Sequence, residues 1–185
     1  KVLHPMTIEP AVRKNIPIYV LNSMNPDGKG TVILQNSKID DGVKSVSSKE
    51  NILVINIFST KMINAAGFLM SVFEIFSRNN VSVDLISTSE ANISVTVDAS
   101  QDIDKVIEEL SSFAEVYVDR DKAQVSVIGK NLDNVTGILE KTFAPLRDYK
   151  IYMISQGASY VNISFIVDRS AMDTVVSLLH HSLFR

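Results

Sequence analysis

The feature of this sequence that most limits its fold is an internal repeat. Residues 55–98 align with residues 125–168 without a gap, at an offset of seventy positions, and ten of the aligned pairs are identical. The run Asn-Ile-Ser at 92–94 recurs at 162–164, and several of the other pairs exchange one apolar residue for another. Self-similarity of this kind marks a duplicated structural unit, so the chain is predicted to contain two copies of one module.

Each copy shows the same change of hydrophobic period. In the first copy, residues 51–59 alternate as in a strand, and the apolar residues that follow Gly67 have the spacing of one helical face. The remaining pattern predicts, in order, strands at 81–90 and 92–98, a helix at 101–113 and a strand at 114–120. The first copy therefore reads strand, helix, strand, strand, helix, strand, and the second copy repeats this order.

The second copy lacks its sixth element, because the sequence ends at Arg185 after the second helix. A sheet without that strand would leave a row of unpaired backbone N–H and C=O groups at its edge. The unassigned strand-like stretch upstream is residues 42–48 (GVKSVSS). We therefore predict that this stretch completes the second module and that the first module is inserted between its parts.

The N-terminal piece belongs to neither module. Residues 2–22 show a short helical pattern followed by an apolar strand, and residues 25–31 (NPDGKGT) form the densest cluster of turn residues. This cluster indicates a turn or hinge. The sequence begins at Lys1 without an initiator methionine, so we expect a fragment of a longer polypeptide.

Composition excludes several classes of function. The net charge of −3 provides no basic excess for a nucleic-acid backbone or an anionic membrane surface. The absence of cysteine excludes disulfides and thiolate metal sites, and the apolar runs are shorter than the ~20 residues of a membrane span. With 45% hydrophobic residues, the chain is expected to be a globular, soluble and intracellular protein.

In this order and spacing, several segments resemble the C-terminal regulatory part of aspartokinases. The stretch KVLHPMTIEPAVRKNIPI is similar to the end of the kinase domain, and NPDGKGTVI is similar to the junction that follows it. The segments GFLMSVFEIF, SVDLISTSE and MISQGASYVNISFIVD are similar to the signature segments of two ACT domains. The resemblance covers nearly the whole chain.

The resemblance implies an α+β fold of two ferredoxin-like βαββαβ ACT domains, with antiparallel sheets, helices on one face and the first domain inserted in the second. The implied boundaries are the end of the amino-acid kinase domain at 1–24, a junction or hinge at 25–41, the first ACT domain at 51–120, and the second at 42–50 plus 121–185. Effectors bind in this family where ACT domains pair side by side, which implies a homodimer.

The function implied by the resemblance is allosteric feedback inhibition of aspartate kinase by an end-product amino acid, lysine in preference to threonine. This fragment would have no catalytic residues, no metal and no cofactor, because ATP and Mg belong to the missing kinase lobe. Effector binding would alter the arrangement of the ACT domains, and the junction would transmit that change. The implied location is the cytoplasm, or the plastid stroma in a plant. Whether the parent chain carries a second enzyme, such as homoserine dehydrogenase, is left open.

The candidate effector site of the first module combines a helix start with an acidic strand. The N–H groups at the first helix turn, after Gly67, suit a carboxylate. Asp84 and Glu90 suit ammonium groups, because charge-assisted hydrogen bonds are roughly twice as strong as neutral ones. The full set of candidate residues is Met62, Asn64, Gly67, Phe68, Leu69, Ser82, Val83, Asp84, Ser89 and Glu90.

The second module offers a weaker site. In the gapless alignment Ile154 replaces Asp84, and Gln156 is the one amide of the segment. An amide does not discriminate charge, so this site is predicted to be weaker or structural, and the module to pair edge to edge with another. Its candidate residues are Asn134, Gly137, Ile138 and Gln156.

Alternative interpretations remain open for each feature. Gly67 is also consistent with a simple turn into the helix. Asp84 is also consistent with a solvated strand end, or with an ion pair to a Lys or Arg of the neighbouring module. His180 and His181 are adjacent on a predicted helix and point in different directions, which favours surface or packing roles over metal binding.

Two functions of other classes compete with effector sensing. One is a non-catalytic dimerisation module whose pocket is vestigial. The other is an RNA-binding βαββαβ domain, which would need aromatic residues on its middle strands for base stacking. Those strands offer only Phe58, and the acidic balance also disfavours RNA.

Overall fold

The structure is a computed structural model that describes residues 3, 5–34, 41–63, 65–158 and 160–184. These residues form two compact units, of which the first ends at Asp40 and the second begins at Asp41. The first unit contains α1 (Pro5–Arg13), β1 (Ile18–Val20) and β2 (Thr31–Ile33). The helix and the apolar strand predicted for this piece are therefore both present.

The turn cluster at residues 25–30 closes a hairpin within the first unit. Strand β1 pairs with β2 in antiparallel register, so part of the segment predicted as a hinge (25–41) is a paired strand. Gly30 has a φ of 59°, a left-handed conformation that suits glycine in tight turns. Of the turn or hinge that this cluster indicates, the structure contains the turn. The domain boundaries inferred from the resemblance remain a prediction.

The second unit is a single six-stranded antiparallel sheet with helices packed on it. Its strand order is β4-β5-β3-β6-β8-β7. The strands are β3 (Gly42–Phe58), β4 (Val83–Thr88), β5 (Asn92–Asp98), β6 (Glu115–Lys130), β7 (Met153–Ser155) and β8 (Asn162–Asp168). The helices are α2 (Phe68–Arg78), α3 (Asp104–Ser111), α4 (Ile138–Phe143) and α5 (Met172–Phe184), with short 3-10 turns η1 (Thr60–Met62), η2 (Leu132–Asn134), η3 (Ala144–Leu146) and η4 (Arg169–Ala171).

The pairing predicted for residues 42–48 is present in the sheet. Gly42 lies opposite Lys130 and Ser48 lies opposite Val125, so the first part of β3 completes the second repeat. The same strand continues to Phe58 as the first strand of the first repeat. Strand β6 likewise belongs to both repeats. The two repeats are therefore not separate sheets but halves of one sheet that share its two central strands.

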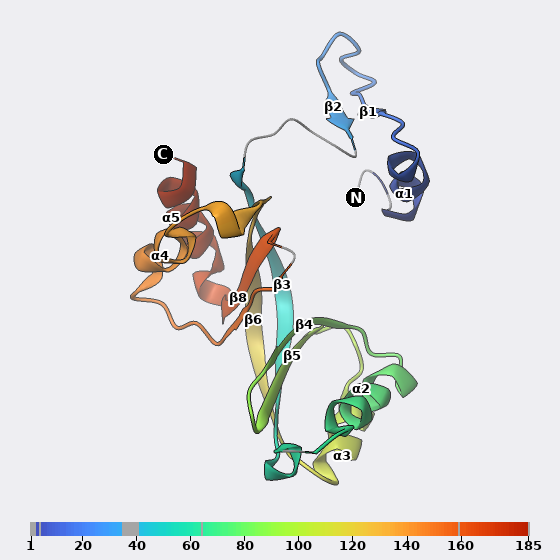
Figure 1. Ribbon diagram of the computed structural model, residues 1–185, viewed down its shortest axis with the longest axis vertical. Coiled ribbons are helices and arrows are strands. Elements are labelled where there is room, and N and C mark those ends of the chain that lie inside the picture. Colours follow the sequence, from blue (N-terminus) through green and yellow to red (C-terminus); the bar gives the residue numbers. More distant parts are fainter. Residues whose placement is uncertain (1–2, 4, 35–40, 64, 159, 185) are drawn as a thin grey trace. The chain divides into compact units, whose positions relative to one another are not determined.

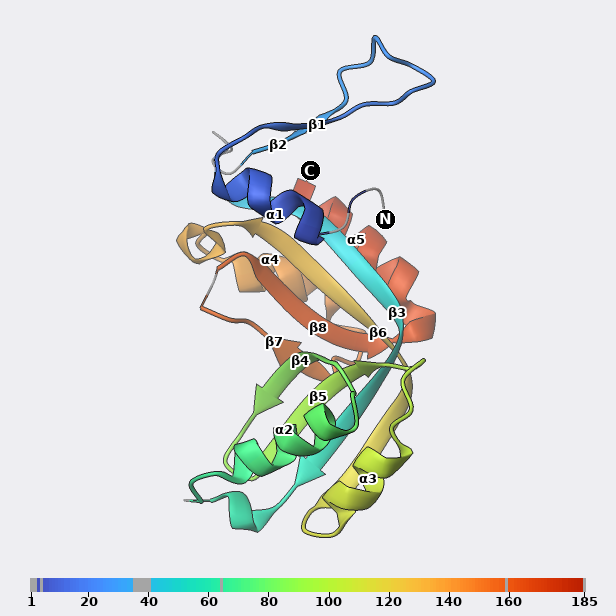
Figure 2. The ribbon, with the colours of Figure 1, turned by 90° about the vertical axis from the view of Figure 1, so that its right-hand side faces the viewer.

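Each half has its own hydrophobic core beneath its own pair of helices. The first core joins α2 and α3 to residues such as Ile55 and Val95, and the second joins α4 and α5 to residues such as Val125 and Phe165, all fully buried. The two helix pairs lie on opposite sides of the sheet, as Figures 1 and 2 show in views at right angles. The duplicated sequence therefore gives two packing units of the same α+β type.

A third apolar cluster joins the two halves where they meet. It contains Ile52 and Val54 of β3, Met153 of β7 and Ile166 of β8, with Leu85 of β4 packed against it. Strands β4 and β7 also approach each other at this point (Figure 2), where the Ser155 hydroxyl donates a hydrogen bond to the Ile86 carbonyl at 3.1 Å. The halves are thus connected by side-chain packing as well as by the shared strands.

The close pairing of β3 with β6 predicts that Gly129 does not tolerate a side chain. A Cβ atom at this position would lie 2.5 Å from the backbone carbonyl oxygen of Gly42, so Gly129→Ala must displace one of the two shared strands. The expected loss in free energy of unfolding is about 1–3 kcal/mol, typical of overpacked sites. Urea denaturation measures it. Ser45→Ala, on the exposed side of β3, should change stability by less than ~0.5 kcal/mol, and equal effects of both substitutions would contradict this packing.

Candidate functional site

The first group of candidate residues lies at the start of α2. Gly67 precedes this helix with a φ of 90°, a left-handed conformation, and no side chain caps the helix N-terminus. Within the described residues, the N–H groups of Leu69 and Met70 have no hydrogen-bond partner. Because these groups point out of the positive end of an 11-residue helix, they are able to donate hydrogen bonds to a carboxylate. Effector binding at this helix start stays a prediction.

The side chains around this helix start divide between the core and the surface. Met62 and Phe68 are partly buried against the first core, and the Phe68 ring meets the edge of Phe113 at 5.7 Å between centroids. Leu69 and Met70 are exposed, at 42% and 72% of their surface. Asn64, which was also a candidate, lies outside the described residues. The exposed pair forms an apolar surface beside the free N–H groups.

The second group of candidates lies at the start of β4, where the strand is irregular. Val83 pairs with Val97 and Ile86 pairs with Val95, so β4 has one residue more than β5 between these positions. Such a bulge redirects side chains. The Leu85 N–H donates to the side-chain hydroxyl of the fully buried Thr96, in the neighbouring strand β5, at 2.9 Å.

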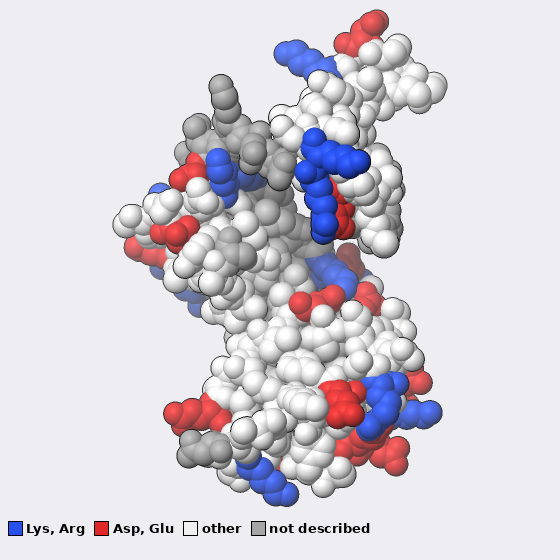
Figure 3. All heavy atoms as spheres, turned by 45° about the vertical axis from the view of Figure 1, so that its right-hand side comes forward, with Lys and Arg blue, Asp and Glu red and all other residues white. Residues whose placement is uncertain are grey.

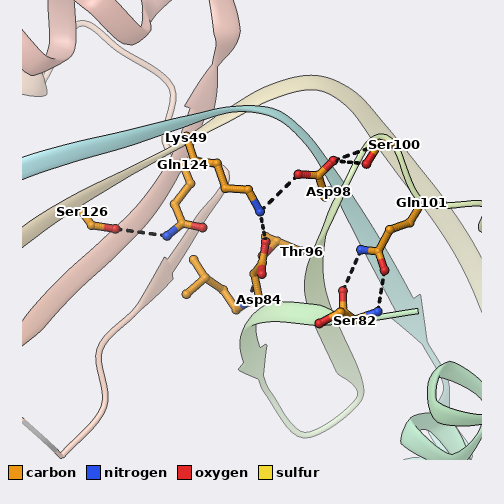
Figure 4. Close-up of polar contacts among 10 residues, drawn as sticks. Lys49, Ser82, Asp84, Thr96, Asp98, Ser100, Gln101, Gln124 and Ser126 are labelled. Atoms are coloured by element: carbon orange, nitrogen blue, oxygen red, sulfur yellow. Dashed lines mark hydrogen bonds and ion pairs between the residues drawn. The ribbon is translucent and has the colours of Figure 1, made fainter. Parts of the chain in front are cut away.

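Ser82, just before β4, is fixed through its backbone. The Gln101 side chain accepts a hydrogen bond from the Ser82 N–H at 2.6 Å and donates one to the Ser82 carbonyl at 2.9 Å. This amide thus holds the beginning of the acidic strand in place, as Figure 4 shows. Gln101 had not been considered from the sequence, since its contact depends on a residue nineteen positions away.

The Asp84 carboxylate is already paired with a cation of the same chain. The Lys49 ammonium donates to Asp84 Oδ2 at 2.6 Å and lies 3.4 Å from Asp98 Oδ2 (Figure 4). Lys49 belongs to the part of β3 that completes the second repeat, whereas both acids belong to the first. Of the interpretations left open for Asp84, the ion pair to a lysine of the neighbouring module is the one that the structure contains.

The pKa shifts in this cluster follow from these contacts. Partial burial lowers the pKa of Lys49, but the hydrogen bonds and charges of Asp84 and Asp98 raise it by more, so the net pKa is raised above 10.5. The pKa of Asp98 is lowered, first by the hydrogen bonds that it accepts from the hydroxyl and N–H of Ser100 and then by Lys49. Both shifts favour the charged forms of Lys49 and Asp98.

Gly67 and Asp84 lie toward opposite ends of α2. The helix has eleven residues between Gly67 and its C-cap, a length of about 16 Å, and Asp84 follows the C-terminal end. One amino acid therefore cannot span both groups of a single subunit. The physical reason is the direction of the helix, which carries the chain away from Gly67 before β4 begins. The cradle that the sequence interpretation placed at a seam between two paired folds stays a prediction.

Ser89 and Glu90 lie in the turn between β4 and β5. The Ser89 N–H donates to the Asn92 carbonyl at 2.8 Å, and the neighbouring Ala91 carbonyl accepts a bond from the Ser59 N–H at 2.9 Å. The turn between β4 and β5 therefore lies next to the C-terminal end of β3, from which the chain continues toward Gly67. Glu90 is exposed, so the two candidate carboxylates, Asp84 and Glu90, mark opposite ends of β4.

The candidates of the second half form a different arrangement. Gly137 precedes α4 with a φ of 74°, but this helix has only six residues, and Ile138 is buried against the second core. Asn134 donates to the Asp41 carboxylate at 3.4 Å, and Gln156 is exposed after β7. The weaker or structural site predicted for this module stays a prediction.

The strand register corrects one equivalence drawn from the sequence. Ile154 lies opposite Phe165 in the second half, and Ile86 lies opposite Val95 in the first. Phe165 is the repeat counterpart of Val95, so the structural counterpart of Ile154 is Ile86, not Asp84. The shift is of two residues, and the bulge of β4 accounts for one of them.

The second half has its own lysine cluster. The Lys122 ammonium donates to Asp168 Oδ1 at 2.9 Å and lies 4.2 Å from the centre of the Tyr152 ring, while the Tyr152 hydroxyl donates to the same carboxylate oxygen at 2.9 Å. Asp168 is the repeat counterpart of Asp98. The bond from Lys122, followed by that from Tyr152, lowers the pKa of Asp168. In the second half, Tyr152 therefore contacts the lysine of the cluster, as Asp84 does in the first half.

A surface depression of about 520 Å³ lies beside this cluster and was not predicted. It is lined by Glu50, Asp121, Asp168, Arg169, Ser170, Met172 and Asp173. Arg169 crosses it to Glu50 at 2.8 Å. The sequence offered no signal for it, because its acids come from three separate segments.

Three further features of the described residues bear on alternative functions. The His180 ring packs against Phe184 at 4.9 Å between centroids, which confirms the packing role for that histidine. On the described part of the face shown in Figure 3, acidic and basic side chains are interspersed and form no continuous basic surface. Among the helices that the structure describes, none has both the length and the apolar character needed to cross a membrane.

Comparison with protein families adds an independent result. The family model of the ACT domain matches residues 55–112 and again residues 125–183. These two ranges are the repeats found in the sequence. Each contains one pair of helices and the outer strands of one half of the sheet.

Similarity to individual proteins extends along the chain. Aspartokinase 1, chloroplastic, of Arabidopsis thaliana is 40% identical over 196 residues, covering 100% of this chain and 34% of that protein. The structure of Escherichia coli aspartokinase III in complex with lysine and aspartate (T-state) is 35% identical, with a TM-score of 0.85, covering 100% of this chain and 43% of that one. A putative C-terminal regulatory domain of aspartate kinase from Porphyromonas gingivalis W83 is 28% identical, with a TM-score of 0.68, covering 76% of this chain and 97% of that one. The chain therefore spans less than half of the two longer proteins.

The second lysine cluster predicts an abnormal titration. Asp168 should titrate below its ordinary pKa of 3.8, and Lys122→Met should raise that pKa toward the ordinary value. Because the folded-state pKa is lowered, the stabilising contribution is complete above the pKa of the unfolded chain and is lost as the pH falls through the folded pKa. The stability difference between wild type and Lys122→Met should therefore shrink below pH 3.8. NMR titration of the carboxyl carbon and acid unfolding measure both effects, and an ordinary Asp168 pKa in the wild type would contradict the cluster.

Proposed function

Since this chain belongs to the ACT domain family and contains two copies of that domain, we propose that it is the effector-binding regulatory region of an aspartate kinase. In this proposal it binds an end-product amino acid and passes the binding signal to a catalytic region outside this chain. The parent protein would phosphorylate aspartate with ATP and Mg in the pathway to lysine, threonine and methionine. It would act in the cytoplasm, or in the plastid stroma of a plant.

The observation that carries this proposal is the first half of the sheet, which contains both a helix start without a side-chain cap and an acidic strand. The free N–H groups at Leu69 and Met70 suit the carboxylate of an amino acid, and Asp84 suits its ammonium group. The relationship to a protein solved with bound lysine supports an amino acid as the ligand. Lysine is preferred over threonine because Glu90 offers a second carboxylate.

The proposed site is completed by a second copy of the chain. Gly67 and Asp84 of one subunit are about a helix length apart, so one zwitterion cannot reach both. Strand β4 is an outer strand of the sheet. In the same half of the sheet, the apolar side chains of Ile86, Leu69 and Met70 are exposed. A two-fold axis beside β4 would place the same patch on both partners, with the helix start of one near the acidic strand of the other.

Inhibition requires that the effector distinguish two arrangements of the halves or subunits. A ligand that binds both arrangements equally does not shift their equilibrium. Typical coupling between an effector site and a distant site is about 1–3 kcal/mol. In this proposal the effector favours the inhibited arrangement by a free energy of that order.

A second function is favoured by one specific observation. The Lys49 ammonium is paired with the Asp84 carboxylate, as expected if the pocket were vestigial and the module served only for dimerisation. Both functions use the same exposed edge. They differ in whether an amino acid binds, so they are separated by a binding experiment and not by the oligomeric state.

The effector site predicts a defined response to amino acids. L-lysine should raise the melting temperature of the wild-type chain and release or absorb heat in calorimetry, because a ligand that binds only the folded state stabilises it. Asp84→Asn should abolish or strongly weaken this response. Asp168→Asn is the matched control, since it also loses an ion pair to a lysine but leaves the first half intact. An unaltered response in Asp84→Asn would remove Asp84 from the site, and no response to any aspartate-derived amino acid would favour the dimerisation module.

The dimer predicts a separate outcome at the helix start. Leu69→Glu should place a charge in the apolar edge patch, so that sedimentation shows a shift toward monomer together with a loss of lysine binding. Tyr117→Glu, at another exposed position (61%), should change neither property. A Leu69→Glu chain that remains dimeric and binds lysine normally would contradict this interface.

A further inference from the structure

The contact between Lys49 and Asp84 depends on an irregularity in β3. The register of β3 against β6 shifts between Lys49 and Ile52, and Asn51 between them has a φ of 58°. This is the place where β3 passes from the second half of the sheet to the first. Because a bulge redirects the neighbouring side chains, Lys49 can reach out of its own half toward β4 and β5.

A second irregularity brings the acid to the same point. The bulge of β4 includes Asp84, and its freed Leu85 N–H is satisfied by the buried Thr96 hydroxyl. Position 96 has isoleucine as its repeat counterpart, Ile166, and β7 pairs with β8 without a bulge. The first half therefore has a local device, absent from the described part of the second, that presents a carboxylate to Lys49.

The cluster contains two acceptors for one cation. Lys49 lies 2.6 Å from Asp84 and 3.4 Å from Asp98, and Asp98 is independently held by two hydrogen bonds from Ser100. Figure 4 shows the ammonium between the two carboxylates. With Lys49 shifted fully to Asp98, Asp84 would be free for a second ammonium group, and the cluster would change from net charge −1 to neutral.

We propose that Lys49 is an internal competitor for the ammonium group of the effector, and that it moves from Asp84 to Asp98 when the effector binds. This inference rests on the proposed function, because it concerns the same Asp84 site. Lys49 acts here through Asp84 and is a positioning residue, not a contact of the ligand. No covalent step is involved, since one ammonium replaces another on the same carboxylate.

The exchange would also couple effector binding to the contact between the two halves of the sheet. In the free chain the Lys49–Asp84 pair fastens β4, the outer strand of the first half, to the part of β3 that belongs to the second half. Effector binding removes this fastening and leaves Lys49 on β5. The relation between the two halves therefore differs between the free and bound states, which is the differential contact that regulation requires.

The test measures L-lysine affinity by calorimetry in the full 185-residue chain. Lys49→Met removes the competing ammonium but keeps the length of the apolar stem, so affinity should increase by up to about fivefold, the equivalent of an exposed ion pair of ~1 kcal/mol. Asp98→Asn removes the alternative acceptor and holds Lys49 on Asp84, so affinity should decrease by a similar factor. A purely structural ion pair would not give opposite signs for these two variants.

Lys122→Met is the matched control. It removes a lysine that pairs with the repeat counterpart of Asp98 but does not contact Asp84, so the affinity for L-lysine should equal that of the wild type. Circular dichroism and urea unfolding establish that each variant is folded. If Lys49→Met does not fold, the wild type still decides the question, because saturating L-lysine should lower the pKa of Asp98 further in an NMR titration.

The outcomes separate this inference from the proposed function. If the wild type binds L-lysine and Asp84→Asn does not, but Lys49→Met binds no more tightly than the wild type, the exchange is overturned and the effector site stands. If neither the wild type nor Lys49→Met binds any amino acid, both fail together. If Lys49→Met binds where the wild type does not, Lys49 stays on Asp84 in the wild type, and the exchange is overturned.

Discussion

The pairing of β3 with β6 is the constraint on which the rest of this structure depends. Each strand is long enough to serve both repeats, and together they form the centre of one sheet. This arrangement follows from covalent connectivity, because the first repeat is inserted between the last strand of the second repeat and its remainder. The two halves therefore cannot move as independent domains. Any change in their relation must be absorbed where the two strands pass from one half to the other.

The passage between the halves is where charge and backbone irregularity coincide. Asn51 in β3 and Asp121 in β6 both have positive φ values, and each is close to a lysine, Lys49 or Lys122, that binds an aspartate at the end of the adjoining strand. Bulges and left-handed residues interrupt regular pairing. The interruption allows lysines to reach across, and the ion pairs occupy surface that the ladder leaves open. The lysine–aspartate cluster of the proposed effector site thus lies at the same place where β3 connects the two halves.

The duplication preserved structure more faithfully than it preserved chemistry. Asn56 and Ser94 are hydrogen-bonded at 2.6 Å in the first half, as Ser126 and Ser164 are at 2.8 Å in the second. At the edge strands, in contrast, β4 has a bulge and an acid, whereas β7 is short and regular. An edge strand is free to diverge because only one neighbour constrains its register. The proposed effector site of the first half lies on that less constrained strand.

The sequence by itself determined the repeat, the order of strands and helices in each copy, and the return of residues 42–48 to complete the second copy. These features depend on local periodicity and on the need to pair backbone groups, both of which are written along the chain. Only the tertiary structure decided that the copies share one sheet, that Lys49 meets Asp84, and that Gly67 and Asp84 lie at opposite ends of α2. Those facts depend on bulges, register and helix direction, which set distances between residues far apart in sequence and leave no signal in the pattern of residue types.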